Sequence, residues 1–206
     1  MAETRERGKR MSALAVAVAV TLLAGCGGGS SGGDDDGGTP GGVAASFTSS
    51  GTSAATGLVR LSGGSASGDT LTVAVVVNGP TTDADVYSYA FDVVLEDTTI
   101  ARFVGGSAVA GTALTPDAGQ GLQVLAEQIG DRVVVGVTKT GGGAGDDLAN
   151  GTAEVVRLSF KVLKAGQSAV YLAGAPGGSG PSALDSDGQA VGAISFDLAD
   201  AYLVGR

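Results

Sequence analysis

The sequence predicts an all-β domain in which two sheets pack together as a sandwich. After residue 54 the apolar residues occur in short runs, and the clearest runs alternate apolar and polar side chains with a period of two. Residues that favour turns, namely Gly, Asp, Asn and Pro, separate these runs. No segment after Ala24 shows a convincing apolar repeat at spacings of three and four, the pattern of an amphipathic helix. Nine predicted strands within residues 55–206 are therefore typical of a β-sandwich.

The first three strands lie in the N-terminal half of this region. We predict short strands at residues 57–61 and 71–77, and the turn residues Asn78-Gly79-Pro80 end the second of them. The third and longest strand covers residues 86–95. One of its two alternating sets is wholly aromatic and aliphatic, so we expect that set to face the core. Its members are Tyr87, Tyr89, Phe91, Val93 and Leu95.

Six further strands follow along the chain. They are predicted at residues 100–104, 122–129, 132–139, 155–163, 169–173 and 201–204. Gly130-Asp131 is a two-residue turn that joins the fifth and sixth strands as a hairpin. The strand at 155–163 alternates most regularly, with Arg157, Ser159 and Lys161 on one face. Because a strand with charges on one face is half buried, its opposite face is expected in the core. That face carries Val156, Leu158, Phe160 and Val162.

The N-terminal residues have the pattern of an export signal. Basic residues precede an apolar run from Ser12 to Ala24, which is about the length of a signal-peptide core and short for a membrane span. The run ends in Leu23-Ala24-Gly25-Cys26, which resembles the lipobox of bacterial lipoproteins. The resemblance implies cleavage before Cys26, a lipid on Cys26, and a protein anchored on the extracytoplasmic side of the membrane. The alternative is an ordinary secretory signal in which the cysteine has no role.

The chain is thus expected to have three parts. Residues 1–25 are the signal peptide, residues 26–54 a tether rich in Gly, Ser and Asp, and residues 55–206 the β-sandwich domain. The tether contains too few apolar side chains to offset the entropy of ordering it. Gly27 follows the cysteine, and in lipoproteins an Asp at that place commonly causes retention in the inner membrane. The resemblance therefore implies export to the outer membrane or cell surface.

Composition argues against an enzyme and against a nucleic-acid partner. The sequence contains no histidine, the commonest general base and metal ligand, and its single cysteine is Cys26. Its formal net charge is −9, and removal of residues 1–25, with four basic and two acidic side chains, changes this to −11. Such a field repels nucleic acid. We therefore expect a binding protein with no catalytic residues, no metal and no cofactor.

Three local motifs have both a functional and a structural interpretation. The stretch Asp185-Ser186-Asp187-Gly188 contains half of a calcium-binding loop, but no further acidic ligands follow at the required spacing, so a turn is favoured. Asp146-Asp147 follows a glycine-rich loop that lacks the Lys-Ser/Thr pair of a phosphate site. Tyr87 and Tyr89 would suit a sugar-stacking platform, but they share a face with Phe91, which favours core packing.

The strand sequences resemble those of cohesin domains. The resemblance rests on residues 89–96 followed by Ile100, on residues 105–107, on 130–137, on 151–162 and on 184–188. It implies a nine-stranded jelly-roll sandwich, related in shape to a group of carbohydrate-binding modules. Cohesins bind dockerin modules through one sheet. The resemblance therefore implies a protein partner of dockerin type, with a carbohydrate-binding surface lipoprotein as the alternative and a structural envelope protein as a third interpretation.

The resemblance also places a binding face. In cohesins the partner lies across the sheet that holds the third, fifth, sixth and eighth strands, which correspond here to residues 86–95, 122–129, 132–139 and 169–173. With the apolar set of each strand turned inward, the outward set would form a shallow surface with apolar anchors and a polar rim. The candidate partner-binding residues are Ser88, Ala90, Asp92, Gln123, Leu125, Glu127, Arg132, Val134 and Thr138. The alternative is a solvated sheet face without a ligand.

Overall fold

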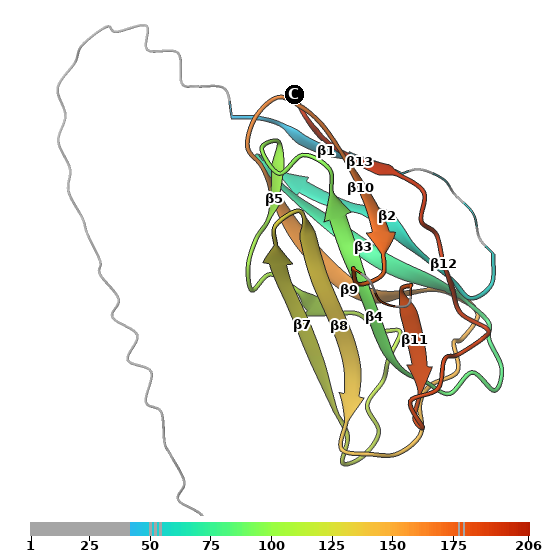
Figure 1. Ribbon diagram of the computed structural model, residues 1–206. Coiled ribbons are helices and arrows are strands. Elements are labelled where there is room, and N and C mark those ends of the chain that lie inside the picture. Colours follow the sequence, from blue (N-terminus) through green and yellow to red (C-terminus); the bar gives the residue numbers. More distant parts are fainter. Residues whose placement is uncertain (1–41, 50, 52, 54, 177, 179) are drawn as a thin grey trace, which may run out of the picture. The chain divides into compact units, whose positions relative to one another are not determined.

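The computed structural model describes residues 42–206 except 50, 52, 54, 177 and 179. These residues form thirteen strands in two sheets that pack face to face (Figure 1). The part of the chain that the structure describes contains no helix long and apolar enough to cross a membrane. Cys26 and the whole signal segment lie outside the described residues, so the lipobox remains a prediction from the sequence.

Sheet A has seven strands. In spatial order they are β1 (Ala45–Thr48), β13 (Ala201–Gly205), β10 (Gly166–Ala173), β4 (Val86–Leu95), β8 (Arg132–Thr140) and β7 (Gly121–Ile129). The seventh, β11 (Ser182–Asp185), pairs with the first half of β4, whereas β10 pairs with its second half. All of these pairings are antiparallel. Sheet A therefore contains all four strands that were predicted to form the binding face.

Sheet B has six strands and covers the inner face of sheet A. Its order is β12 (Ser195–Phe196), β2 (Leu58–Ser67), β3 (Thr70–Gly79), β9 (Gly151–Val162) and β5 (Ala101–Phe103), and β6 (Val109–Ala110) also pairs with β9. Of the two long central strands, β9 alternates apolar and polar residues from Val156 to Val162, whereas β3 is a nearly continuous apolar run that is buried from Val73 to Asn78. The alternation of β9 is expected of a strand with one face in the core and the other in solvent, and the continuous run of β3 is expected of a strand buried on both faces.

All nine predicted strands are present, and the structure adds four short ones: β1, β6, β11 and β12. Strand β1 lies within residues 26–54, the stretch predicted to be tether, and pairs with β13 from Ala45 to Thr48. The sandwich therefore begins before residue 55, and the predicted boundary is too late. A four-residue strand escapes pattern analysis because its only large apolar residue is Phe47, which packs against the core.

In both β4 and β9, the set of alternate residues predicted to face the core is the set that the structure buries. Tyr89, Phe91, Val93 and Leu95 of β4 are all buried. Phe160 of β9 is fully buried and meets the ring of Phe103 edge-on, with a centroid separation of 5.9 Å. The burial of Tyr89 rules it out as a sugar platform, and burial also raises the pKa of its hydroxyl. Tyr87, two residues earlier, is only half-buried.

Candidate functional site: the outer face of sheet A

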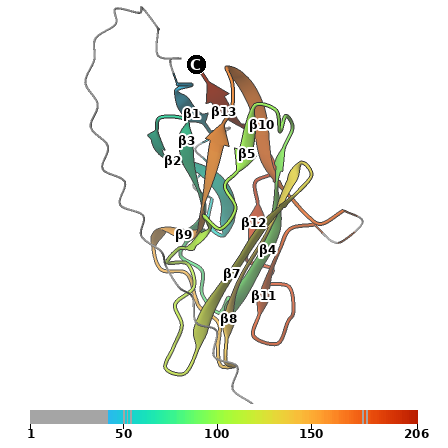
Figure 2. The same ribbon diagram turned by 90° about the vertical axis from the view of Figure 1, so that its left-hand side faces the viewer.

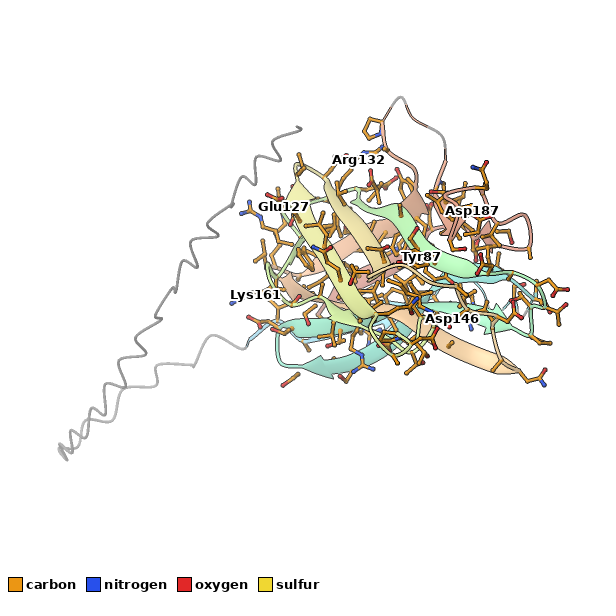
Figure 3. The ribbon with its side chains drawn as sticks, turned by 90° about the horizontal axis from the view of Figure 1, so that it is seen from below. Tyr87, Glu127, Arg132, Asp146, Lys161 and Asp187 are labelled. Carbon is orange, nitrogen blue, oxygen red and sulfur yellow. The ribbon has the colours of Figure 1, made fainter. Side chains whose placement is uncertain are left out.

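Strand register brings the predicted binding residues together in rows on one face of sheet A. Ser88, Thr138 and Gln123 stand side by side on β4, β8 and β7. The next rows are Ala90, Gly136 and Leu125, then Asp92, Val134 and Glu127, then Val94, Arg132 and Ile129. Figure 3 shows Glu127 and Arg132 on the two neighbouring strands β7 and β8. All nine candidate residues therefore share one surface, which is called here the outer face.

The outer face carries two exposed apolar side chains along its β7 margin, and the residues at its centre have small side chains or none. Leu125 and Ile129 on β7 are 58% and 63% exposed, and Gln123 and Glu127 beside them are also exposed. In the middle, Ala90 carries only a methyl group and Gly136 has no side chain at all. A Cβ added at Gly136 would meet no atom within 4 Å, so the space above it is open. Small residues on two adjacent strands thus create a trough beside the Leu125 ridge.

The trough opens into a hollow of about 460 Å³ between β8 and the segment after β10. Its floor is formed by Ala90, Asp92 and Val134, and its far wall by Leu184 and Ala190. The hollow exists because β10 ends opposite Asp92 while β11 begins opposite Ala90, and the connection between them leaves the plane of the sheet. Ala175, Gly178 and Gly180 of that connection complete the lining. The result is a mainly apolar depression that opens to solvent.

Asp92 does not have the predicted exposed position. It is only 2% exposed, and one carboxylate oxygen accepts a hydrogen bond from Arg132 Nη1 at 2.8 Å. The same guanidinium nitrogen donates to the backbone oxygen of Gly174 at 2.9 Å. This ion pair fastens the β10–β11 connection onto the sheet and thereby shapes the hollow. Asp92 and Arg132 are therefore structural residues of the outer face, and Asp92 offers almost no surface to a partner.

The other seven candidate partner-binding residues fall into an exposed group and a half-buried group. Ala90, Gln123, Leu125 and Glu127 are exposed, whereas Ser88, Val134 and Thr138 are half-buried between neighbouring strands. The Thr138 hydroxyl already donates to the backbone oxygen of Lys139 at 3.0 Å. Gly136, Ile129 and Leu184 were not among the partner-binding residues predicted from the sequence. The alternation of β7 pointed to Ile129, but a glycine gives no side-chain signal and Leu184 lies on a strand too short to recognise.

The acidic motifs lie at one end of the sandwich and are occupied in holding loops together. Asp185 accepts hydrogen bonds from the backbone amides of Asp187 and Gln189, and Gly188 has φ of +78°, so residues 185–188 form a tight turn. Asp147 accepts a hydrogen bond from the Ala84 amide. Within the described residues there is no group of three or more His, Cys, Asp or Glu side chains that could hold a metal ion.

Asp85 ties two of these loops together. Its carboxylate accepts hydrogen bonds from the hydroxyl and amide of Ser186 and from the Gly145 amide. These bonds, with that of the Ser186 hydroxyl the largest, hold the pKa of Asp85 below its usual range. The carboxylates of Asp85, Asp147 and Asp185 therefore have hydrogen-bond partners within the protein.

A buried lysine near this end was not noticed in the sequence. Lys139 follows Val133, Val135 and Val137 on the inward set of β8, and its side chain has no exposed surface. Its Nζ lies 3.2 Å from Asp146 Oδ1 and 3.7 Å from Asp117 Oδ2. The other oxygen of Asp146 accepts the Thr115 amide at 2.7 Å. Strict alternation along β8 would have predicted this burial, since position 139 has the parity of the three valines.

Comparison with known proteins gives matches only at the level of structure. No protein-family model and no curated protein matches the sequence. A type II cohesin domain from the cellulosome of Acetivibrio cellulolyticus superposes with a TM-score of 0.50 at 16% identity, over 71% of this chain and 92% of that one.

A second match is the type II cohesin dyad from the adaptor ScaA scaffoldin of Acetivibrio cellulolyticus. It gives a TM-score of 0.52 at 15% identity and covers 72% of this chain. This chain spans only 48% of the dyad, about half its length. At this identity the likeness concerns the fold alone. The chain is a two-sheet β-sandwich of the kind seen in cohesin modules.

Proposed function

We propose that this chain is a non-catalytic binding module that holds a protein partner of dockerin type on the outer face of sheet A. The observation that carries the proposal is the trough along Ala90 and Gly136, flanked by the exposed Leu125, on a cohesin-like fold. Isolated exposed apolar residues are ordinary, but Leu125 stands in one row with Gly136 and Ala90, and Ala90 also lines the apolar hollow.

The arrangement fits the usual anatomy of a protein interface. The Leu125 ridge and the hollow would form its apolar centre, and Gln123, Glu127 and Ser88 its polar rim. Residues that fill a desolvated pocket contribute most of the binding energy, so we expect the partner to insert an apolar side chain into the hollow. Glu127 is exposed and forms no ion pair in the described structure, which favours a basic or amide group at the adjacent edge of the partner.

The carbohydrate-binding alternative has less support. Sugar-binding faces present planar aromatic rings to solvent. Among the described residues, the large apolar side chains that reach high exposure are all aliphatic: Val104, Val109, Leu125, Ile129, Leu163 and Leu198. Tyr89 is buried and Tyr87 half-buried. The protein-binding function is therefore the better supported of the two.

The binding test uses changes that alter the outer face without disturbing the fold. Leu125→Asp places a charge in the proposed contact, and Gly136→Leu fills the trough where a side chain meets no neighbour. Once a partner has been captured from envelope extracts with residues 42–206, each variant should weaken its binding at least about tenfold, the equivalent of 1.4 kcal/mol. Isothermal titration calorimetry measures the affinity and a thermal melt confirms folding.

Leu198→Asp is the matched control. Leu198 is 55% exposed, close to the value for Leu125, but lies between β12 and β13, on the opposite margin of the sandwich. Its replacement should leave binding unchanged. Val134→Asp is a weaker probe, because Val134 is half-buried and its change is expected to lower the melting midpoint as well. Full affinity in both Leu125→Asp and Gly136→Leu would exclude the outer face as the binding site.

We also propose that Cys26 carries a lipid that anchors the module to the cell envelope. The support is the sequence Leu23-Ala24-Gly25-Cys26 after an apolar run, with Cys26 as the sole cysteine. Two or more acyl chains hold a protein stably on a membrane, where one is marginal. Cys26→Ser should move the protein from the membrane fraction to the soluble fraction or leave it unprocessed. An intact mass that shows a soluble mature form with a free Cys26 thiol would contradict this proposal.

A further inference from the structure

Strand β7 is the longest strand at the end of either sheet. Natural sheets protect their edges by short strands, bulges, proline or lysine, because an open edge pairs readily with another chain. Here β1 and β11 have four residues each, β5 has three, and β6 and β12 have two. Strand β7, the outer margin of sheet A in Figures 1 and 2, has nine residues and contains neither proline nor lysine. Its register with β8 runs without a shift from Gly121 to Ile129, so no bulge protects it.

The hairpin turn determines which backbone groups of β7 are free. Ile129 and Arg132 flank the two-residue turn Gly130-Asp131, so they form a pair joined by backbone hydrogen bonds. Every second residue from Ile129 back to Gly121 therefore forms its backbone hydrogen bonds with β8. The amides and carbonyls of Leu122, Val124, Ala126 and Gln128 point away from β8. Among the described residues, these four backbones form no hydrogen bond with loops or with other strands.

The side chains around this edge are also unusually apolar. Leu125 and Ile129 stand on β7 itself, and Val104 and Val109 belong to the adjoining segment that includes β6, which lies against β7. These four are most of the six large apolar side chains with high exposure in the described chain. An open strand edge and an apolar surface thus coincide on one margin of the molecule.

We propose that β7 pairs antiparallel with β7 of a second copy, so that the two A sheets join into one continuous sheet. Pairing along the whole strand places the two-fold axis at Leu125, because residues 121–129 are symmetric about it. Leu125 then faces Leu125 of the other copy in a close pair without hydrogen bonds. Val124 and Ala126 of the two copies exchange backbone hydrogen bonds.

This register is self-complementary in charge. Gln123 lies opposite Glu127 of the other copy, so each carboxylate meets an amide that can donate to it. The two Glu127 side chains are separated by four residues along the strand, roughly 14 Å at about 3.4 Å per residue. This distance exceeds the Debye length of about 8 Å at physiological salt. Gly121, which has no side chain, lies opposite Ile129 and leaves room for it. No like charges face each other across the proposed pair.

The dimer is expected to be weak. An edge contact between two nine-residue strands is smaller than a standard stable interface of about 1,600 Å². The first measurement is sedimentation equilibrium of residues 26–206 with Cys26→Ser, a change that also removes the only thiol able to form a disulfide-linked dimer. We expect reversible dimerisation with a dissociation constant of about 10 μM to 1 mM. A chain that remains monomeric up to about 1 mM contradicts the proposal.

Ala126→Pro tests whether the free edge of β7 is the contact. Its amide points away from β8, so proline removes a donor from the edge but none from the sheet. The dimer constant should weaken at least about tenfold. The Ala126 side chain faces inward, so the outer face keeps its side chains and the partner affinity stays unchanged. Leu198→Asp should leave the dimer intact, and a dimer that survives Ala126→Pro in a folded variant excludes this edge.

Charge changes at position 123 test the register of the proposed pair. They do not require that the Ala126→Pro variant folds. Gln123 is exposed, so its replacement leaves the core intact. Gln123→Glu would face Glu127 twice in the symmetric dimer and weaken it, whereas Gln123→Lys would form two ion pairs and strengthen it, each by roughly threefold or more. Equal effects of both variants would exclude the register centred on Leu125. Gly136→Leu should not affect the dimer, which separates this proposal from the partner-binding proposal.

Discussion

Phe160→Ala is expected to lower the free energy of unfolding by about 3–5 kcal/mol. Phe160 is fully buried in the middle of β9, where it packs against Phe103 and faces the inner side of sheet A. Its truncation removes apolar contact and leaves a cavity that the two rigid sheets cannot close. Urea denaturation followed by far-ultraviolet circular dichroism measures the loss, since the sequence contains no tryptophan for fluorescence.

Lys161→Ala is the matched control on the next residue. The Lys161 side chain is 55% exposed and forms a single ion pair with Asp69 at 3.3 Å. Because an exposed ion pair contributes little, its removal should change the free energy of unfolding by no more than roughly 0.5 kcal/mol. Equal losses for the two variants would mean that the buried and exposed faces of β9 are wrongly assigned.

Lys139→Ala is expected to cost about 3 kcal/mol, the lower end of the range for breaking a buried ion pair. The ammonium group is fully buried beside Asp146, and its loss leaves that carboxylate without a counter-charge. Asp146 retains some contact with solvent, since its side chain is 22% exposed, and this limits the cost. The same urea titration measures the effect.

The double variant Lys139→Met/Asp146→Asn separates the ion pair from the packing of the lysine chain. Replacing both charges removes the penalty of an unpaired group, so the double variant should be more stable than Lys139→Ala. Asp117→Asn serves as control, because Asp117 is 70% exposed and lies 3.7 Å from the ammonium. It should cost less than about 0.5 kcal/mol. A loss below about 1 kcal/mol for Lys139→Ala would show that the ammonium group reaches water.

The outer-face residues that the sequence predicted correctly are those whose side follows from the alternation of apolar and polar residues along a strand. Leu125, Glu127 and Val134 occupy the predicted side of their strands, because the period of two is local and independent of which strand lies beside them. The hollow beside them was not predictable. It depends on the place where β10 ends and β11 begins along β4, a consequence of pairing between segments far apart in the sequence.

Asp92 and Lys139 show that a charged residue in a strand is not always exposed to solvent. Asp92 was predicted on the outward set of its strand and no prediction was made for the Lys139 side chain, yet both are buried against a charged partner supplied by another segment. Arg132 reaches Asp92 across the β4–β8 pair, and Asp146 reaches Lys139 from the loop after β8. A buried charge is tolerated only with such a partner. The local pattern contains no information about that partner's position.

From the sequence alone followed the all-β class, the nine principal strands and the inward face of each long strand, because the period of apolar residues determines them locally. Tertiary structure was needed for β1 before residue 55, the pairing of Asp92 with Arg132, and the hollow beside Ala90 and Val134. It also left β7 as the longest strand at the end of either sheet among the described residues. Strand order and edge length arise from contacts between distant segments, so the hydrophobic period of any single strand does not specify them.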